Sequence, residues 1–466
     1  MKPISVKQIV EAVSGKLAWG DEETMVTEVV IDSRKAGEGS LFVPIIGERV
    51  DAHKFIPDVL AQGATVTFSS DCGVKGEKGA CIFVDDTLQA LQKLAAWYRS
   101  QFTIPVIGIT GSVGKTTTKE MIAAVLEKKY RTVKTIGNLN SQIGVSLMMF
   151  HLEGDTEMAV FEMGISMPGE MDKLVEIARP TTAFLTNIGV SHIGNLGSRE
   201  NICKEKGKII QKFSDDGVLY VCGNGDLKQL STDNIPYETC EGKCRTIYYG
   251  TEPVDAFYGD SIVTEGNGQK FVYHHGEGAE EVRLSVMGNH NVNNAVVALA
   301  LAEQYQVPAD LAKEALWSYE PIAMRGVVKD VAGVHIIDDT YNASPDSINS
   351  NLNALFDHPG GNKIAVLADV LELGEQSGEL HEGVGRFILS EAEKGRKLAL
   401  LVTVGTESVF IHETVKKHSD IPAVHCESNE EAVETIRKQM QKGDWILVKG
   451  SRGMHMEEVV EHLMRE

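Results

Sequence analysis

The chain of 466 residues is too long for a single hydrophobic core, so we expect two to four domains. Its apolar content of 42% and charged content of 24% are ordinary for a globular protein, and its net charge of −21 argues against a nucleic-acid-binding surface. No apolar run reaches the length of a membrane span and no signal-peptide pattern follows Met1, so we expect a cytoplasmic protein. The seven scattered cysteines fit reduced thiols in that compartment.

The first segment mixes short strand and helix patterns. It ends in a predicted helix over Leu88 to Tyr98, where Leu88, Leu91 and Leu94 recur at helical spacing. The polar residues that follow lead to Pro105 and form a plausible linker. We therefore predict an N-terminal domain over residues 1–98.

The second segment alternates strand and helix patterns over residues 99–320. It opens with an apolar strand, and each later strand candidate is followed by a loop or helix pattern; the candidates are Val106–Thr110, Met158–Glu162, Thr182–Thr186 and Val218–Cys222. This alternation predicts a mostly parallel sheet with helices on both faces. Gly-rich turns and alternating runs in residues 251–286 predict β-hairpins.

The third segment, residues 321–466, repeats the α/β pattern on a smaller scale. Its strand candidates are Val334–Ile337, Ile364–Leu367, Leu398–Val402 and Trp445–Val448, with helix patterns between them. The predicted fold class is therefore α/β with three domains: a small α/β N-terminal domain, a central P-loop-type ATPase domain on a parallel sheet, and a doubly wound, Rossmann-like C-terminal domain.

The strongest local motif is a phosphate-binding loop between a strand and a helix. The glycines let backbone N–H groups point at phosphate oxygens, Lys115 can reach the β- and γ-phosphates, and Thr116 can bind Mg²⁺. The predicted nucleotide contacts are Gly111, Ser112, Gly114, Lys115, Thr116 and Thr117. The strict P-loop spacing requires glycine at position 109, where this chain has Ile109. A glycine-rich turn with an exposed lysine is the alternative interpretation.

The spacing Gly108-x-x-Gly111-x-x-Gly114-Lys115-Thr116 resembles the ATP loop of the Mur ligase family and of folylpolyglutamate synthase. Further stretches, in order along essentially the whole chain, are similar to the MurF type of Mur ligase: Asp32 to Arg34, Leu41 to Val43, Asn138 to Val145, Glu162 to Gly164, Thr186 to Gly189 with His192, Gly288 to Ala295, Ile337 to Ala343, Leu371 to Gly374 and Val448 to Arg452. Departures from the usual family residues occur at Val113, Ser191, Ser344 and Ala368.

The resemblance implies an ATP-dependent ligase that forms an amide bond (EC 6.3.2). MurF-type enzymes join D-alanyl-D-alanine to UDP-N-acetylmuramoyl-tripeptide through an acyl phosphate, a cytoplasmic step of peptidoglycan synthesis. The departures leave open a divergent paralogue that adds another amino acid or acts on another carrier. The third residue of the peptide, meso-diaminopimelate or lysine, also stays open. By analogy we expect a monomer.

The resemblance also implies a site for two Mg²⁺ ions, with Thr116, Glu162, His192 and Lys206 as the ligands. Glu162 ends an apolar strand, where the strand-edge rule for parallel sheets places functional groups. Lys206 corresponds to a lysine that the family carries as a carbamate, which supplies oxygen ligands. The alternatives are a surface acid, a structural histidine and a solvated lysine between Lys204 and Lys208.

The remaining nucleotide contacts are implied by the resemblance. Asn291 and Asn294 correspond to residues that read the adenine, Asp339 to the acid beside the ribose, and Arg325 to an arginine that reaches the γ-phosphate from the third domain. The asparagines could also cap the helix that follows them. The predicted catalytic residues are Lys115, Lys206 and Arg325. Because two contacts come from another domain, the site should be complete only after domain closure.

The predicted substrate contacts lie in all three segments. For the UDP-substrate they are Ser33, Arg34, Gly47, Arg49, Asp51 and His53; for its peptide, Asn138 and Asn140; and for D-alanyl-D-alanine, Asp369, Lys449, Ser451 and Arg452. Ordinary surface charge is the alternative for each of them.

Two other classes of protein share part of this pattern. A kinase or nucleotide switch could carry the phosphate loop, but it would not account for the segments on either side. A non-catalytic binding protein is expected to have lost Lys115, Glu162 or Arg325, which are all present. Phosphate release that depends on both a carboxylate and an amine distinguishes these classes.

Overall fold

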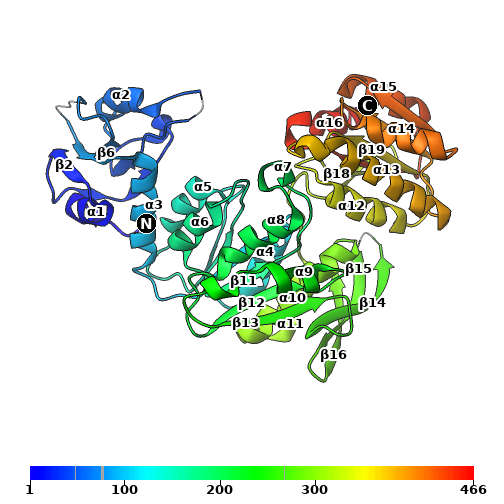
Figure 1. Cartoon of the computed structure of the whole chain (residues 1–466), viewed down its shortest axis with the longest axis horizontal. Coiled ribbons are helices and arrows are strands. Elements are labelled where there is room, and N and C mark those ends of the chain that lie inside the picture. The colour runs from blue at the N-terminus through cyan, green and yellow to red at the C-terminus, as the bar shows by residue number, and fades with distance from the viewer. Residues whose placement is uncertain (48, 75–77, 267, 466) are drawn as a thin grey trace.

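The computed structural model describes residues 1–47, 49–74, 78–266 and 268–465 and contains three domains arranged in a row. In Figure 1 the N-terminal domain (blue) and the C-terminal domain (yellow to red) lie on opposite sides of the central domain. The predicted three-domain α/β class is confirmed. The division of the chain at residues 98 and 320 stays a prediction.

The N-terminal domain is built on a sheet in the order β2-β7-β6-β5-β4. Its strands are β2 Lys16–Trp19, β4 Glu28–Val30, β5 Ser40–Phe42, β6 Val66–Ser69 and β7 Ala80–Phe83; β1 Ile4–Ser5 pairs separately with β3 Met25–Val26. Pairing is parallel from β4 to β7, and β2 runs antiparallel. Its helices are α1 Val6–Val13 and α2 Ile56–Ala61.

The predicted helix at the end of the first segment is α3 Thr87–Arg99. The Asp86 carboxylate caps it by accepting from Gln89 N at 2.9 Å. Its apolar side, with Leu91 and Leu94, is fully buried. At its end, the Arg99 guanidinium donates to the Phe102 and Ala178 carbonyl oxygens at 2.6 and 3.0 Å. These bonds fasten the linker to the central domain.

The central sheet has the order β16-β15-β14-β13-β12-β11-β8-β10-β9. Pairing is parallel from β9 to β14 and antiparallel from β14 to β16. The strands are β8 Val106–Thr110, β9 Thr132–Lys134, β10 Met158–Glu162, β11 Thr182–Leu185, β12 Gly217–Cys222, β13 Cys244–Gly250, β14 Phe257–Glu265, β15 Gly268–His275 and β16 Gly278–Leu284. The predicted mostly parallel sheet and the hairpins are confirmed, although β11 ends one residue early. The partly exposed strands β9 and β13 were not predicted.

Helices cover both faces of the central sheet. One face holds α4 Lys115–Leu126, α10 Asn289–Gln304 and α11 Ala309–Trp317 against β8 residues such as Ile107 and Ile109. The other face holds α5 Gln142–Met149, α6 Glu170–Ala178 and α8 Arg199–Gly207, with α7 Ile193–Leu196 and α9 Leu227–Asn234 nearby. This burial on both sides explains why the parallel strands read as continuous apolar runs.

The C-terminal domain has the sheet order β17-β18-β22-β19-β20-β21. Its strands are β17 Val327–Val331, β18 Val334–Asp339, β19 Lys363–Ala368, β20 Leu400–Val404, β21 Ala423–Cys426 and β22 Trp445–Lys449. Only the edge strand β17 is antiparallel to its neighbour among these pairs. Alternate β19 residues face α12 Pro345–Asp357, α13 Ser377–Glu393 and α14 Val409–His418 on one side, and α15 Asn429–Gln439 and α16 Glu457–Leu463 on the other. The doubly wound prediction is confirmed; β20 begins at Leu400, not Leu398.

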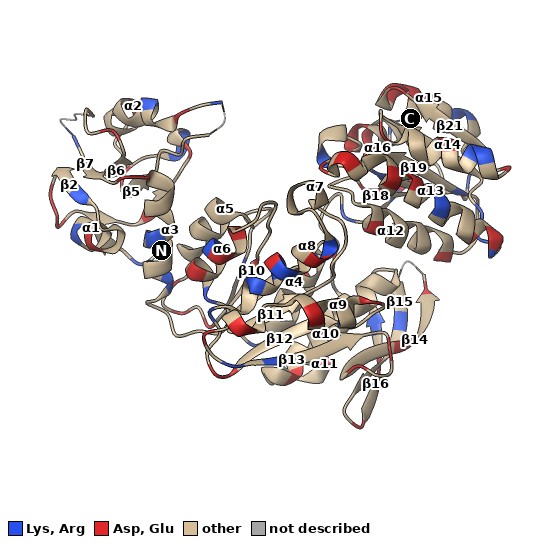
Figure 2. Ribbon diagram, in the orientation of Figure 1, with Lys and Arg blue, Asp and Glu red and all other residues tan. Residues whose placement is uncertain are grey.

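Acidic and basic residues are interspersed over all three domains in the view of Figure 2. In the described residues, no helix is both long and apolar enough to cross a membrane. All seven cysteines are free thiols in the structure.

Candidate active site

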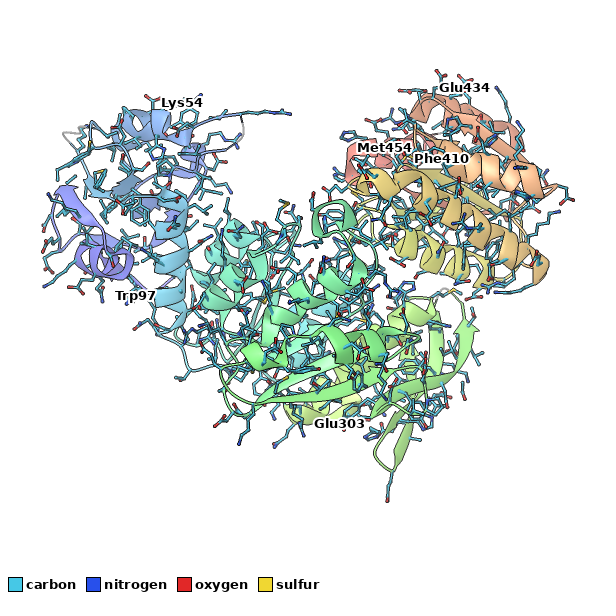
Figure 3. All side chains as sticks on the ribbon, viewed as in Figure 1. Lys54, Trp97, Glu303, Phe410, Glu434 and Met454 are labelled. Carbon is cyan, nitrogen blue, oxygen red and sulfur yellow. The ribbon has the colours of Figure 1, made fainter. Side chains whose placement is uncertain are left out.

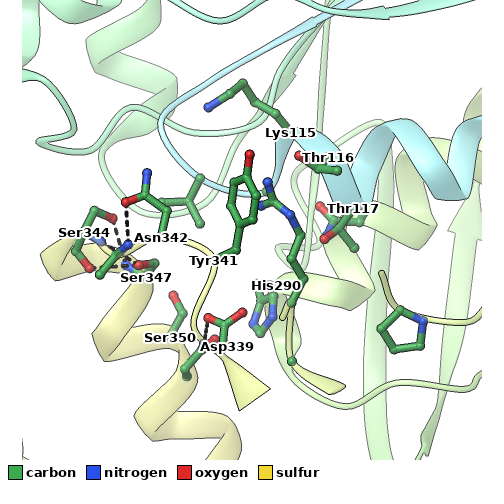
Figure 4. Close-up of a pocket in the computed structure, with 18 of the residues that line it drawn as sticks. Lys115, Thr116, Thr117, His290, Asp339, Tyr341, Asn342, Ser344, Ser347 and Ser350 are labelled. Carbon is green, nitrogen blue, oxygen red and sulfur yellow. Dashed lines mark hydrogen bonds between the residues drawn. The ribbon is translucent and has the colours of Figure 1, made fainter. Parts of the chain in front are cut away.

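A cavity of about 580 Å³ lies where the central and C-terminal domains meet. Figure 4 shows residues of the phosphate loop on one wall and residues of β18 and α12 on the other. Many of the predicted site residues line it: Ser112, Gly114, Lys115, Thr116, Thr117, Asn138, Asn140, Glu162, His192, Asn291, Asn294, Arg325, Asp339 and Lys449. The fold thus brings together residues as far apart in the chain as Ser112 and Lys449.

The phosphate loop joins β8 directly to α4. Gly111 and Gly114 have φ angles of 146° and 84°, and a Cβ at Gly111 would lie 2.0 Å from Thr186 Oγ1, so both positions require glycine. Asn187 holds the loop, since its backbone and side-chain oxygens accept from Ser112 N at 3.0 Å and Val113 N at 2.7 Å. The N-terminal end of α4 therefore points into the cavity, as anion binding needs.

The Lys115 side chain lies along this loop, and its Nζ donates to the Gly111 carbonyl oxygen at 2.8 Å. Burial lowers the pKa of Lys115, the nearby Arg325 lowers it further, and Glu162 opposes both effects. The lysine lines the cavity. Lys115 is half-buried in the cavity wall, which favours the phosphate loop over a glycine-rich turn with an exposed lysine.

Glu162 is the last residue of β10 and is 2% exposed. Its Oε2 accepts from Thr116 Oγ1 at 2.9 Å, and its Oε1 accepts from Asn140 Nδ2 at 2.8 Å. The alternative of a surface acid is therefore wrong. A buried carboxylate beside a hydroxyl and a phosphate loop is the oxygen-rich setting that Mg²⁺ prefers. Within the described residues, no group of three or more His, Cys, Asp and Glu side chains forms a metal site.

Lys206 lies on α8 with only 1% of its surface exposed. Burial and the positive charge of Lys115 lower the pKa of Lys206 well below its ordinary value, whereas Glu205 and Glu170 raise it. The alternative of a solvated helix lysine is therefore wrong for Lys206. Lys208, which follows it by two residues, is half-buried, and its Nζ pairs with Asp172 and Glu205, each at 2.8 Å.

His192 follows β11 and contacts the C-terminal domain. Its Nδ1 lies 2.5 Å from Glu372 Oε2, an ion pair when the imidazole is protonated. Both residues have left-handed backbones, with φ angles of 62° and 66°. Burial lowers the pKa of His192, Glu372 opposes this effect, and Lys206 and Lys115 add to it. A further contact between these domains joins Val190 N to Asp346 Oδ2 at 3.1 Å.

Asn291 and Asn294 lie on one side of α10, in its first two turns. Asn294 Oδ1 accepts from Thr118 Oγ1 at 2.9 Å, and Asn291 Nδ2 donates to the Met287 carbonyl oxygen at 2.7 Å. Gly288 occupies the position before the helix, so the alternative that the asparagines cap it is wrong. These bonds hold the start of α10 against α4.

Arg325 and Asp339 form the C-terminal wall of the cavity. The Arg325 guanidinium carbon lies 4.0 Å from the ring centroid of Tyr341. Asp339 ends β18, and its carboxylate accepts from both Asn351 Nδ2 and Lys449 Nζ. Lys449, predicted to contact D-alanyl-D-alanine, thus lies beside the predicted ribose contact.

The predicted UDP-substrate residues lie in the N-terminal domain, outside this cavity. Arg34 is 87% exposed and pairs with Asp32 at 2.7 Å. His53 Nδ1 lies 2.7 Å from Asp51 Oδ1, and its Nε2 lies 2.9 Å from Ser70 Oγ. Ser33 is half-buried, and Gly47 and Arg49 are exposed on the loop after β5. Figure 3 labels Lys54, the chain neighbour of His53, on this domain, far from Met454 on the C-terminal domain.

Three predicted D-alanyl-D-alanine residues, Asp369, Ser451 and Arg452, do not line the cavity. The buried Asp369 carboxylate accepts from Thr406 N, Glu407 N and Ser408 N at 2.9, 3.0 and 2.7 Å, so it holds the turn before α14. Ser451 Oγ accepts from Leu371 N at 2.9 Å. Arg452 is exposed and pairs with Glu457 at 2.9 Å.

The sequence interpretation missed several cavity residues, among them His290, Tyr341, Asn351, Glu170 and Tyr319. Burial lowers the pKa of His290, and the positive charge of Lys449 lowers it further. Tyr341 lies two residues after Asp339, within the stretch Ile337 to Ala343 that resembles the family. Its place in that stretch could have indicated that it lines the site. Asn351 carried no such indication, because its contact with Asp339 depends on how α12 packs.

Comparison with known proteins agrees with this architecture. Three family models match the chain: the Mur ligase family catalytic domain over residues 25–99, the Mur ligase middle domain over 109–302, and the Mur ligase glutamate ligase domain over 325–452. The chain is 37% identical to the UDP-N-acetylmuramoyl-tripeptide--D-alanyl-D-alanine ligase of Bacillus subtilis, with 99% of this chain and 98% of that protein covered.

Solved structures give the same result. MurF from Acinetobacter baumannii matches with a TM-score of 0.89 at 30% identity and 100% coverage of both chains. The MurF ligase of Thermotoga maritima in complex with ADP matches with a TM-score of 0.83 at 28% identity, covering 94% of this chain and 97% of that one. Because relatives of this similarity cover the whole chain, the protein belongs to the Mur ligase family, within its MurF type.

Proposed function

We propose that the protein ligates D-alanyl-D-alanine to UDP-N-acetylmuramoyl-tripeptide with consumption of ATP, the reaction named for its Bacillus subtilis relative. The observation that carries this proposal is the shared cavity. One wall is a phosphate loop, and the other supplies Arg325 and Asp339 from a different domain. A simple nucleotide switch does not need a second wall of this kind.

The proposed reaction depends on stabilising the negative charge of the phosphoryl group that is transferred. Transfer of the γ-phosphoryl group to the tripeptide carboxylate gives an acyl phosphate, and attack by the amine of D-alanyl-D-alanine releases phosphate. The loop N–H groups, Lys115 and Arg325 stabilise negative charge on the transferring group. Because they come from two domains, their alignment depends on how those domains close.

We also propose a site for two Mg²⁺ ions. Thr116 and Glu162 hold one ion together with ATP oxygens, and His192 and Lys206 complete the second. Bound Mg²⁺ would neutralise phosphate charge and orient the γ-phosphoryl group. The hydroxyl, carboxylate and imidazole suit this ion, but an ammonium at Lys206 would repel it. A carbamate on Lys206 reverses that charge and supplies oxygen ligands.

The substrate contacts are proposed as follows. Ser33, Arg34, Gly47, Arg49, Asp51 and His53 bind the nucleotide-sugar part, and Asn138 and Asn140 hold the peptide. On the other side, Asp369 and Ser451 shape the loop that receives D-alanyl-D-alanine, with Lys449 and Arg452 near it. The protein acts as a cytoplasmic monomer whose domains divide at residues 98 and 320.

The direct test is phosphate release by the purified protein. We expect release from ATP only when UDP-N-acetylmuramoyl-tripeptide and D-alanyl-D-alanine are both present. Single amino acids in place of the dipeptide form the other arm, and a preference for one of them would favour the divergent paralogue. Release without any amine would contradict the ligase assignment.

A further inference from the structure

Arg325 is held in the cavity wall by an aromatic ring. Its guanidinium carbon lies 4.0 Å from the centroid of Tyr341, well within the range of a cation–π contact. Among the described residues, no carboxylate forms an ion pair with Arg325 and no side-chain hydrogen bond of Arg325 is found. Other arginines of the chain are paired with acids, for example Arg34 with Asp32 and Arg199 with Asp226.

The backbone places these two residues beside each other. Gly326 N donates to the Asp338 carbonyl oxygen at 2.9 Å, and Tyr341 N donates to the Met324 carbonyl oxygen at 3.1 Å. These bonds extend the antiparallel pairing of β17 and β18 beyond its regular end. The residues on either side of Arg325 have left-handed φ angles, 65° at Met324 and 74° at Gly326. Arg325 therefore lies in a tight turn at the end of the paired strands β17 and β18.

The contact has a chemical consequence. A carboxylate partner would neutralise the guanidinium and occupy its N–H donors, whereas an aromatic face attracts the cation and leaves the in-plane donors free. The arginine lies near Lys115, whose pKa it helps to lower. Two unneutralised cations facing one cavity suit a polyanion such as the triphosphate of ATP.

We propose that Tyr341 is a positioning residue for Arg325. Its ring holds the guanidinium toward the transferring phosphoryl group and does not neutralise the positive charge of the guanidinium. Figure 4 shows Tyr341 on the C-terminal side of the cavity, across from Lys115 and Thr116. The Tyr341 hydroxyl forms no hydrogen bond to a described residue. We therefore assign the positioning of Arg325 to the aromatic ring. This inference rests on the proposed function of Arg325.

The test compares Tyr341→Leu, which removes the ring, with Tyr341→Phe, which keeps it. We expect Tyr341→Leu to lower kcat roughly 5- to 20-fold with little change in the KM for ATP, and Tyr341→Phe to retain most of the turnover. In an Arg325→Ala background, Tyr341→Leu should cost nothing further, because the group that it positions is gone.

Tyr248→Leu is the matched control. The Tyr248 ring also stacks on a cation, with Lys228 Nζ 4.8 Å from its centroid, but it lies outside the cavity. We expect its kcat to be unchanged. A Tyr341→Leu enzyme with wild-type kcat, or equal losses from Tyr341→Leu in both backgrounds, would overturn the positioning role. If Arg325→Ala itself is harmless, the proposed function of Arg325 fails instead.

A readout independent of catalysis uses the protein with ¹⁵N-labelled arginine. The Arg325 Nε–H signal, identified by its loss in Arg325→Lys, should show a ring-current shift that Tyr341→Phe retains and Tyr341→Leu abolishes. An unshifted signal in the wild-type protein would contradict the stacking, whatever the substrate of the enzyme proves to be.

Discussion

Single residues of the phosphate loop have roles that follow from their contacts. Lys115 Nζ donates to the Gly111 carbonyl oxygen and lies near the buried Glu162, so its ammonium is held at the loop where we propose that the phosphates bind. Thr116 and Asn140 each donate to one oxygen of Glu162 and so fix the orientation of its carboxylate. Each side chain depends on the loop as a whole, since Asn187 holds the loop backbone.

Lys115→Ala should therefore remove charge stabilisation of the transition state and leave the fold intact. We expect kcat to fall by about 10²- to 10³-fold, the usual effect of losing one preorganised donor. Lys128→Ala is a suitable control, because Lys128 follows α4 and pairs with Glu314 at 2.8 Å away from the cavity. Steady-state phosphate release measures both. A well-folded Lys115→Ala protein with near wild-type turnover would show that the loop does not serve ATP.

Lys206→Ala should lose most of the activity, since the proposed carbamate oxygens are lost with the side chain. Added acetate or formate should restore part of it by supplying an oxygen ligand in the vacated space. The exposed Lys204 provides the control, and Lys204→Ala should be mild. A carbamate signal from protein equilibrated with ¹³C-bicarbonate should be present in the wild type and absent in Lys206→Ala. Full activity of Lys206→Ala contradicts the assignment.

At the scale of elements, the parallel strands set where the chemistry occurs. β8, β10 and β11 end at the same edge of the central sheet, so the phosphate loop, Glu162 and the segment of His192 meet there. In the C-terminal domain, the end of β18 supplies Asp339 in the same way. The strands thereby carry residues from distant parts of the chain to one cavity.

The junction of α12 and β22 contains a stack of three rings. The ring centroid of His358, just after α12, lies 3.7 Å from that of Trp445 at the start of β22, and the ring centroid of His335 lies 4.3 Å from that of Trp445. Burial, with smaller effects of Lys363 and His335, lowers the pKa of His358 from 6.5 to about 4. The ring is therefore neutral in the folded protein at neutral pH.

This pKa predicts acid sensitivity with a definite sign. As the pH falls below 6.5, the unfolded chain protonates His358 before the folded one does, so stability decreases until the pH reaches about 4. His358→Phe keeps the stack and should remove up to about 3 kcal/mol of that loss. Urea unfolding of both proteins at pH 7 and pH 4.5 measures the difference, with the exposed His418→Phe as control. Parallel pH profiles would contradict the prediction.

At the scale of the whole molecule, the proposed substrate contacts are divided among three domains. The proposed nucleotide-sugar residues occupy the N-terminal domain, whereas Arg325 and Asp339 line the cavity from the C-terminal domain. These two domains lie on opposite sides of the central domain (Figure 1). The described contacts between the central and C-terminal domains include Val190 with Asp346 and His192 with Glu372. Polar contacts of this kind permit relative movement of the domains.

We therefore expect the protein to become more compact when an ATP analogue and UDP-N-acetylmuramoyl-tripeptide bind together. Small-angle X-ray scattering should record a smaller radius of gyration with both ligands than with either alone. Arg325→Ala should reduce kcat more than it weakens ATP binding, because the arginine acts after closure. An unchanged radius together with a harmless Arg325→Ala would contradict the closing mechanism.

The sequence alone was enough to predict the order of the elements and the central residues of the proposed ATP site. The apolar runs predicted both ends of β8 and of β10 correctly, because strands that are buried on both faces consist mainly of apolar residues. The loop from Gly111 to Thr117 was equally readable, since its backbone geometry demands glycines at fixed spacing. Glu162 followed from the rule that parallel strands deliver functional groups at their carboxyl ends.

The contacts that join distant parts of the chain could not be predicted from the sequence and are seen only in the three-dimensional structure. Charge alone suggested a solvated Lys206, yet the packing of α8 buries it beside Lys115. Asp369 proved to hold the turn before α14, and Lys449 to pair with Asp339. The stacking of Tyr341 on Arg325 depends on an antiparallel ladder that no local pattern encodes. Local patterns reflect backbone preference and burial, whereas side-chain partners depend on how complete elements pack.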